Sequence, residues 1–426
     1  MELSHARGKI LDDAEPVDQN PHYVHSVTEM GEENDIVAQE DIFAANGMKL
    51  LAKGARINRR TLQRLGEHKL KTPLDVLLVS SNTLDETALA RDIDRLLAAD
   101  PILSAITVRS GDPQGWKALL GGPILSPPIA FRLTVMRDGR NDLYLHSLRI
   151  AVVAHCMGMR LELPYEESRN LFLAALCHDF GEMHTDPAIL APGHRIDSDE
   201  QRFIYVHPVT GYVVLQQMNC VAAEVMQAVR QHHERLDGSG YPYGEAGTQI
   251  GQLARILAVS ETLEAVVRRF GADRVNVVLR LSQGRLDQGC IVAACDLLPA
   301  HLHQYEGGAA NYELDKKLAR LANVVRAWDA LQGQIGGNKQ NAALQFVSER
   351  ISGLQSLAIQ AGLARELLEF LDLEGNDASM LPELNAALEE IDRLLDSLAL
   401  EIDRRVTPAA PCRGVAEEIL AALRAA

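Results

Sequence analysis

Aromatic residues, paired cysteines and long apolar runs are all scarce in this chain of 426 residues. Phe, Trp and Tyr make up only 4% of it, while Ala and Leu are abundant, a composition that favours helices. The six cysteines form no Cys-x-x-Cys pair, so a reduced compartment fits better than a disulfide scaffold. No signal-peptide pattern opens the chain, and no window reaches about 18 apolar residues. We therefore expect a cytoplasmic protein without a transmembrane helix.

Positive charge is also in short supply. Lys and Arg number 42 against 58 Asp and Glu, which gives a net charge of −16. Such a charge repels nucleic acid backbones and anionic membranes, so neither DNA nor a membrane is an expected partner. A small anionic substrate would need a local positive centre, such as a metal ion or a few arginines.

Changes in composition along the chain predict a mainly α protein with five regions. An Asn46-Gly47 turn between apolar runs indicates a hairpin, and Asn58 is placed to cap a helix that contains Leu62 and Leu65. The regions are a poorly ordered N-terminus (1–35), a small α+β module (36–80), a helical connector (81–137), a histidine-rich helical domain (138–305) and a C-terminal helical region (306–426).

The C-terminal region contains an apolar seam with heptad spacing. Its members follow a 4,3,4,3,4 pattern: Leu384, Leu388, Ile391, Leu395, Leu398 and Ile402. This pattern fits an internal helical hairpin and a dimeric coiled coil equally well, so a homodimer is one of two hypotheses.

Histidine is concentrated in one part of the chain. Eight of its 14 histidines lie between His146 and His233. Four helical segments carry His146, the pair His178-Asp179, His207, and the pair His232-His233, at successive spacings of 32, 29 and 25 residues. Helices that far apart can point their side chains at one place in the core of a bundle. Imidazole and carboxylate are ligands of divalent Fe, Mn and Zn, so this pattern predicts a metal site.

These residues, together with the run "HHERLDGSGYP" at 232–242, resemble the HD-GYP family over roughly residues 138–285. Members of this family are HD-superfamily phosphodiesterases that hydrolyse cyclic di-GMP. The resemblance implies a helical HD-superfamily bundle and hydrolysis to the linear dinucleotide, to GMP, or to both. It implies cyclic di-GMP as the substrate. It also makes the GYP loop a candidate docking surface for a diguanylate cyclase or another signalling protein.

The resemblance also implies roles for individual residues and two divalent transition metals, with Fe or Mn favoured. Asp179 matches the bridging carboxylate. An acidic residue one turn before the first histidine recruits a third metal in some members, and Asp142 fits either that role or an exposed helix face. The implied metal ligands are His146, His178, Asp179, His207, His232, His233 and Glu261, and the implied substrate-binding residues are Asp237, Gly238, Gly240, Tyr241, Pro242 and Arg269.

The chain departs from the family pattern at three places. "HDFGE" places Glu182 where the family has a lysine that meets the substrate phosphate, which should weaken anion binding unless Glu182 points away or meets a metal. "VSETLEA" replaces the ligand Asp by Glu261 and a second Asp by Glu264. The family's Arg-Pro-Tyr-Arg stretch is absent, with Phe270 at its first arginine, and Arg268 and Arg269 just before it either substitute for that arginine or form a plain basic helix end. Three interpretations follow: an active cyclic di-GMP phosphodiesterase, a degenerate domain that acts as a metal or nucleotide sensor or as a protein-interaction module, and a phosphohydrolase for another nucleotide.

Overall fold

The computed structural model describes residues 20–190, 200–270, 284–298, 342–360, 381–405 and 413–424, with isolated positions between 275 and 327. Its contacts separate two compact units, residues 1–265 with 284–299, and residues 266–283 with 300–426.

Helices predominate, which confirms the mainly α class. The elements up to residue 298 are α2 (Pro21–Glu33), β1 (Ile36–Ala38), β2 (Ile42–Phe43), β3 (Lys49–Leu51), α3 (Arg59–Gly66), α4 (Leu74–Leu77), β4 (Leu78–Ser80), α5 (Glu86–Ala99), α6 (Pro101–Arg109), α7 (Trp116–Leu119), α8 (Pro127–Gly139), α9 (Asn141–Arg160), α10 (Tyr165–Cys177), the 3-10 helix η2 (Phe180–His184), α11 (Gln201–Met218), α12 (Ala223–Gln231), η3 (Gly247–Gln249), α13 (Gln252–Phe270) and α15 (Gln288–Leu297).

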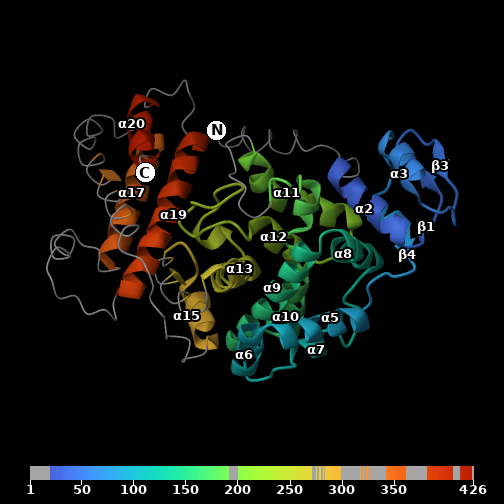
Figure 1. The fold of residues 1–426 in the computed structure, drawn as a ribbon, viewed down its shortest axis with the longest axis horizontal. Helices are drawn as coiled ribbons and strands as arrows, with labels where there is room; N and C mark the ends of the chain where they lie inside the picture. Colours follow the sequence, from blue (N-terminus) through green and yellow to red (C-terminus); the bar gives the residue numbers. More distant parts are fainter. Residues whose placement is uncertain are drawn as a thin grey trace. The chain divides into compact units, whose positions relative to one another are not determined.

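The small α+β module is present near the N-terminus. Strand β1 pairs with β4, and β2 pairs with β3, in two antiparallel ladders. The turn at Asn46-Gly47 joins β2 to β3, as the sequence predicts, and the Asn46 side chain accepts a bond from the Met48 N–H. Asn58 caps α3 by accepting the Thr61 N–H at 3.0 Å. In Figure 1 the strands and α3 lie together, and α2 runs from them to α8.

Part of the segment expected to be poorly ordered is a helix. The expectation covered residues 1–35, of which residues 1–19 lie outside the described part, but α2 occupies Pro21–Glu33. Asn20 caps this helix by accepting the His22 N–H, and Tyr23, Val27 and Met30 are buried against the molecule. Spacings of four and three residues put these three side chains on one face of the helix. This apolar stripe is short, and the acidic composition of the segment made it hard to recognise in the sequence.

The metal-binding candidates lie on a bundle formed by α9 to α13. Helix α10 packs on α9 and α12, and α11 packs on α12 and on η2. Helix α9 is buried along most of its length and includes Leu148, Ile150 and Val152, each fully shielded from solvent. An apolar helix in the centre of such a bundle provides a rigid support for side chains projecting from its neighbours.

A buried charged cluster ties the N-terminal module to the bundle. Arg132 on α8 is 1% exposed and pairs with Asp75 on α4 at 2.7 Å. Its guanidinium also lies 4.0 Å from the ring centroid of Tyr23 on α2, and it contacts His184 at the end of η2. The Tyr23 hydroxyl donates to Asp75. Burial, and then the Arg132 charge, lower the pKa of His184, so its neutral ring accepts the guanidinium N–H.

The second unit contains α17 (Ala342–Gln360), α19 (Leu381–Arg405) and α20 (Arg413–Arg424). The heptad seam lies on α19, which packs against α17 and α20. Five seam residues are each at most 3% exposed within the single chain: Leu388, Ile391, Leu395, Leu398 and Ile402. The structure therefore supports the internal helical hairpin, while the side chain of Leu384 lies outside the described part. None of the described helices is both long and apolar enough to cross a membrane.

Asp75→Ala should destabilise the first unit strongly, because it leaves the Arg132 charge buried without its partner. We expect a loss of about 3–5 kcal/mol in the free energy of unfolding, measured by urea titration. Adding Arg132→Met should recover part of that loss. Arg56→Ala, which removes the exposed ion pair with Asp35, is the control and should change little. Equal losses in the single and double variants would contradict the prediction.

His155 should make the stability of the protein fall in mild acid. Neither ring nitrogen has a hydrogen-bond partner among the described residues, and burial lowers the pKa of His155 to about 4. Unfolding restores a pKa near 6.5, so the unfolded chain binds more protons, and stability is lost as pH falls from about 6.5 towards 4. Between pH 8 and 6 the wild type should lose about 0.8 kcal/mol more than His155→Leu. Parallel urea titrations of both proteins would show equal pH slopes if His155 had no such role.

Candidate metal centre

The Asp179 carboxylate lies between two pairs of histidines. Helix α10 ends at Cys177, so His178 caps it and Asp179 follows in the next turn. One carboxylate oxygen, Oδ2, lies 3.0 Å from His178 Nε2 and 3.6 Å from His146 Nε2. The other, Oδ1, lies 3.4 Å from His207 Nε2 and 3.8 Å from His232 Nε2. Asp179 thus presents one carboxylate oxygen to each pair of histidines.

Three of the rings are oriented by carbonyl groups that the helices leave unused. His178 and His232 follow the last residues of α10 and α12, where helix carbonyls lack donors, and their Nδ1–H groups donate to Ala175 and Val229. His207 lies inside α11, but Pro208 has no N–H, which frees the Ile204 carbonyl to accept from His207 Nδ1 at 2.6 Å.

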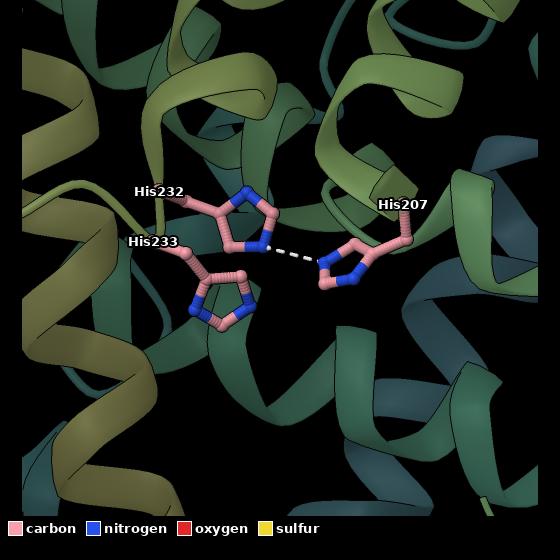
Figure 2. Close-up of side chains that lie close together, drawn as sticks. All are labelled: His207, His232 and His233. Carbon is pink, nitrogen blue, oxygen red and sulfur yellow. Dashed lines mark hydrogen bonds between the residues drawn. The ribbon is translucent and has the colours of Figure 1, made fainter. Parts of the chain in front are cut away.

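With Nδ1–H engaged in these bonds, the neutral form of each ring turns Nε2 to the centre as a lone-pair acceptor. His178 Nε2 and His146 Nε2 are 3.3 Å apart, and His207 Nε2 and His232 Nε2 are 3.2 Å apart. Figure 2 shows the rings of His207 and His232 turned towards each other, with His233 beside them. Acceptors that converge in this way need a cation or a shared proton between them.

His233 and Glu261 complete the histidine side of the cluster. The nitrogens of His207, His232 and His233 lie within 4.8 Å of one another. Glu261 on α13 places Oε1 3.6 Å from His233 Nε2, while its buried Oε2 has no hydrogen-bond partner among the described residues. The ring of Tyr241 stacks on His233 with centroids 4.5 Å apart.

Close backbone contacts at two glycines hold the elements in place. A Cβ on Gly181 would lie 2.0 Å from the His207 carbonyl oxygen, so only glycine lets η2 press against α11. A Cβ on Gly240 would lie 2.3 Å from the His233 carbonyl oxygen. Each glycine therefore sits directly against the backbone of a histidine in the cluster.

The "HHERLDGSGYP" run forms a loop braced by its own acidic residues. The carboxylate of buried Glu234 accepts the backbone N–H groups of Tyr243 and Glu245 at 2.8 and 3.0 Å. Asp237 accepts the N–H and hydroxyl of Ser239, and Arg285 lies 4.0 Å from its other oxygen. Gly238 has a positive φ of 74°, and the Tyr241–Pro242 peptide bond is cis. These contacts explain the glutamate and the turn residues that follow the two histidines.

The donor set fits divalent ions. Burial lowers the pKa of His207, His232 and His233, which keeps these rings neutral, the form in which histidine binds metals. Burial also opposes a charge on His178, but the adjacent Asp179 outweighs it and raises the pKa of His178 to about 9. A bound cation would take the place of that proton. The buried Oε2 of Glu261 has no hydrogen-bond partner among the described residues, and contact with a bound cation would satisfy it.

The structure adds residues that sequence reasoning left without a role. Glu264 Oε2 lies 3.2 Å from His146 Nδ1, so this carboxylate orients the first histidine. Arg235 donates to the His232 carbonyl and acts electrostatically on Glu261. Its place directly after "HHE" was a usable signal for a cation beside the centre. Asp142 is exposed and belongs to none of the metal-competent groups of described residues.

The substitutes for the missing arginines cannot be placed at the centre. The side chains of Arg269 and Phe270 lie outside the described residues. Arg269 therefore stays a sequence prediction.

Comparison with known proteins identifies the segment that carries this centre. Residues 134–279 match the HD domain family. A cyclic di-GMP phosphodiesterase of Pseudomonas aeruginosa is 37% identical over 141 residues, which cover 33% of this chain and 34% of that protein. A 3'3'-cGAMP-specific phosphodiesterase of Vibrio cholerae is 32% identical over 37% of this chain and 39% of that protein. The cyclic di-GMP phosphodiesterase response regulator of Xanthomonas campestris is 33% identical over 37% of this chain and 43% of that protein.

An HDG"Y"P protein from Bdellovibrio bacteriovorus aligns in structure with 62% of this chain and 94% of its own, at a TM-score of 0.35 and 13% identity. The HD-domain match and the similarity to the two cyclic di-GMP phosphodiesterases confirm the resemblance to the HD-GYP family. The matches to the three curated relatives span less than half the length of each relative.

Pro208→Ala should weaken metal binding although it restores a normal helix residue. The new alanine would donate its N–H to the Ile204 carbonyl, compete with His207 Nδ1 and loosen the ring. We expect about tenfold weaker Mn(II) affinity, measured by calorimetry. Gln216→Ala, an exposed change on the same helix, is the control. Unchanged affinity in Pro208→Ala would show that the freed carbonyl does not matter.

Proposed function

We propose that this protein is a metal-dependent phosphodiesterase that opens cyclic di-GMP to the linear dinucleotide, to GMP, or to both. The observation that carries the proposal is the Asp179 carboxylate, with one oxygen facing His146 and His178 and the other facing His207 and His232. The named activities of the similar proteins from Pseudomonas aeruginosa and Xanthomonas campestris support the same chemistry.

In this proposal His146 and His178 hold one divalent ion, and His207, His232 and His233 hold a second, with Asp179 shared between them. Fe or Mn suits a set of imidazole nitrogens and carboxylate oxygens. Two such ions supply a nucleophile at neutral pH and neutralise charge on the phosphodiester. Glu261 lies near His233 and adds an oxygen ligand that is one methylene longer than the family's Asp. Asp179, which holds both ions, is the residue on which catalysis depends.

The GYP loop forms the substrate side of the proposed site. Tyr241 stacks on His233 and fixes that ring, while Glu234 pins the loop through two backbone N–H groups. Arg235 supplies positive charge beside the centre, where an anionic phosphodiester would bind. Asp237, Gly238, Gly240 and Pro242 shape the lip of the site, and Arg269 remains a proposed phosphate contact.

A second candidate function is that of a metal or nucleotide sensor, or of a protein-interaction module, without turnover. Glu182 favours it, because a carboxylate near Asp179 and His207 repels an anionic substrate where the family pattern has a lysine. A diguanylate cyclase or another signalling protein docking on the GYP loop would belong to this alternative.

Turnover by protein loaded anaerobically with Fe(II) or Mn(II) should separate the two candidates. We expect linear dinucleotide from cyclic di-GMP on chromatography, and at least a hundredfold lower rate in Asp179→Asn, because both ions lose their shared ligand. Assays with 3'3'-cGAMP define which cyclic dinucleotide is preferred. Glu166→Gln, an exposed change at the start of α10, is the matched control and should retain full activity.

Metal content must be measured on the same samples. Protein that holds ions but forms no linear product with Mn, Fe, Co or Ni would move the assignment to the sensor. Protein that binds no ion at all would overturn the metal-dependent phosphodiesterase and the metal sensor, and would leave the nucleotide sensor and the interaction module.

A further inference from the structure

Glu182 points at the metal centre. It lies on η2, the short helix that directly follows Asp179, and Gly181 presses this helix against α11. A carboxylate oxygen of Glu182, one of Asp179 and a nitrogen of His207 all lie within 4.8 Å of one another. Backbone packing therefore fixes Glu182 at a distance at which one ion could contact all three side chains.

No described residue hydrogen-bonds to the Glu182 carboxylate or forms an ion pair with it within 4 Å. Arg140, at the junction of α8 and α9, acts on it only at longer range. The side chain is half-buried, so solvent reaches it only in part.

The charge of the cluster also favours a cation near Glu182. Asp179, Glu182 and Glu261 put three carboxylates around the imidazoles, and Asp179 and Glu261 both act on Glu182. Like charges held together in a buried place are costly unless a cation lies between them. An ion coordinated by Asp179 and His207 would satisfy this need for Glu182.

We propose that Glu182 is an oxygen ligand of the divalent ion held by Asp179 and His207. The residue thus replaces a substrate-binding cation of the family pattern by an additional metal ligand. The inference rests on the metal centre of the proposed function but not on turnover. A further carboxylate on one ion favours hard cations such as Mn(II) at that position and reduces the charge left to attract a phosphodiester.

Glu182→Gln tests the proposal because it keeps the size of the side chain and removes its charge. In Mn(II) calorimetry with elemental analysis, we expect one of the two ions to bind at least tenfold more weakly and the other to keep its affinity. The Mn(II) electron paramagnetic resonance spectrum of the loaded protein should change as well. Glu182→Lys should lose the weaker ion altogether.

Glu166→Gln is the matched control. It removes one acidic charge from the same domain, and Glu166 is exposed at the start of α10. Its Mn(II) affinities and spectrum should equal those of the wild type. An effect as large as that of Glu182→Gln would mean that overall charge, and not coordination, is responsible, and would overturn the proposal.

Thermal melting gives a second readout that a folding defect would not imitate. Metal-free Glu182→Gln should melt at the same temperature as the wild type or higher, because a repelling carboxylate is gone. Its stabilisation by saturating Mn(II) should be smaller, since weaker binding stabilises less. Equal affinities and equal stabilisation in both proteins would overturn the role of Glu182, whereas loss of turnover alone would bear only on the proposed function.

Discussion

The two-sided contact of the Asp179 carboxylate is the constraint on which the rest of the centre depends. Its oxygens face different histidine pairs only because α10 stops at Cys177 and the chain turns at once into η2. That turn brings Gly181 against the His207 backbone, where any side chain would collide. The position of Asp179 and the position of α11 are therefore set by one backbone contact, and a shift in either would separate the two histidine pairs.

Unused helix carbonyls set the orientation of the rings. Two of the histidines lie just past helix ends and a third precedes a proline, and in each case the Nδ1–H donates to a carbonyl three residues earlier. The usual weak points of a helix, its terminus and an internal proline, thus become the parts that direct Nε2 inward. This arrangement also accounts for the adjacent His232 and His233, whose rings lie with centroids 4.1 Å apart and both contact the ring of His207.

The sequence predicted the helical class, the hairpin at Asn46-Gly47 and the cap at Asn58 because each rests on local chemistry. It failed at α2, whose three buried side chains are too few to show through an acidic segment. The heptad seam left two hypotheses open, because a period of 3.5 residues is satisfied by any helical partner. Tertiary packing within one chain buries Leu388, Ile391 and Leu395, and their spacing alone does not predict which helices bury them.

The same limit applies inside the centre, where the motif predicts residue types and the backbone decides their contacts. Histidine spacing was enough to place four segments around one point, but it gave no role to Glu264, which faces the far nitrogen of His146. For Glu182 the sequence showed a reversed charge, which fits a damaged substrate site, a side chain that points away and a carboxylate that meets a metal. The packing of η2 against α11 places that carboxylate beside Asp179 and His207, where a negative charge attracts a metal ion before it repels a phosphate. Departures from a family motif therefore need to be judged by what the substituted atom touches.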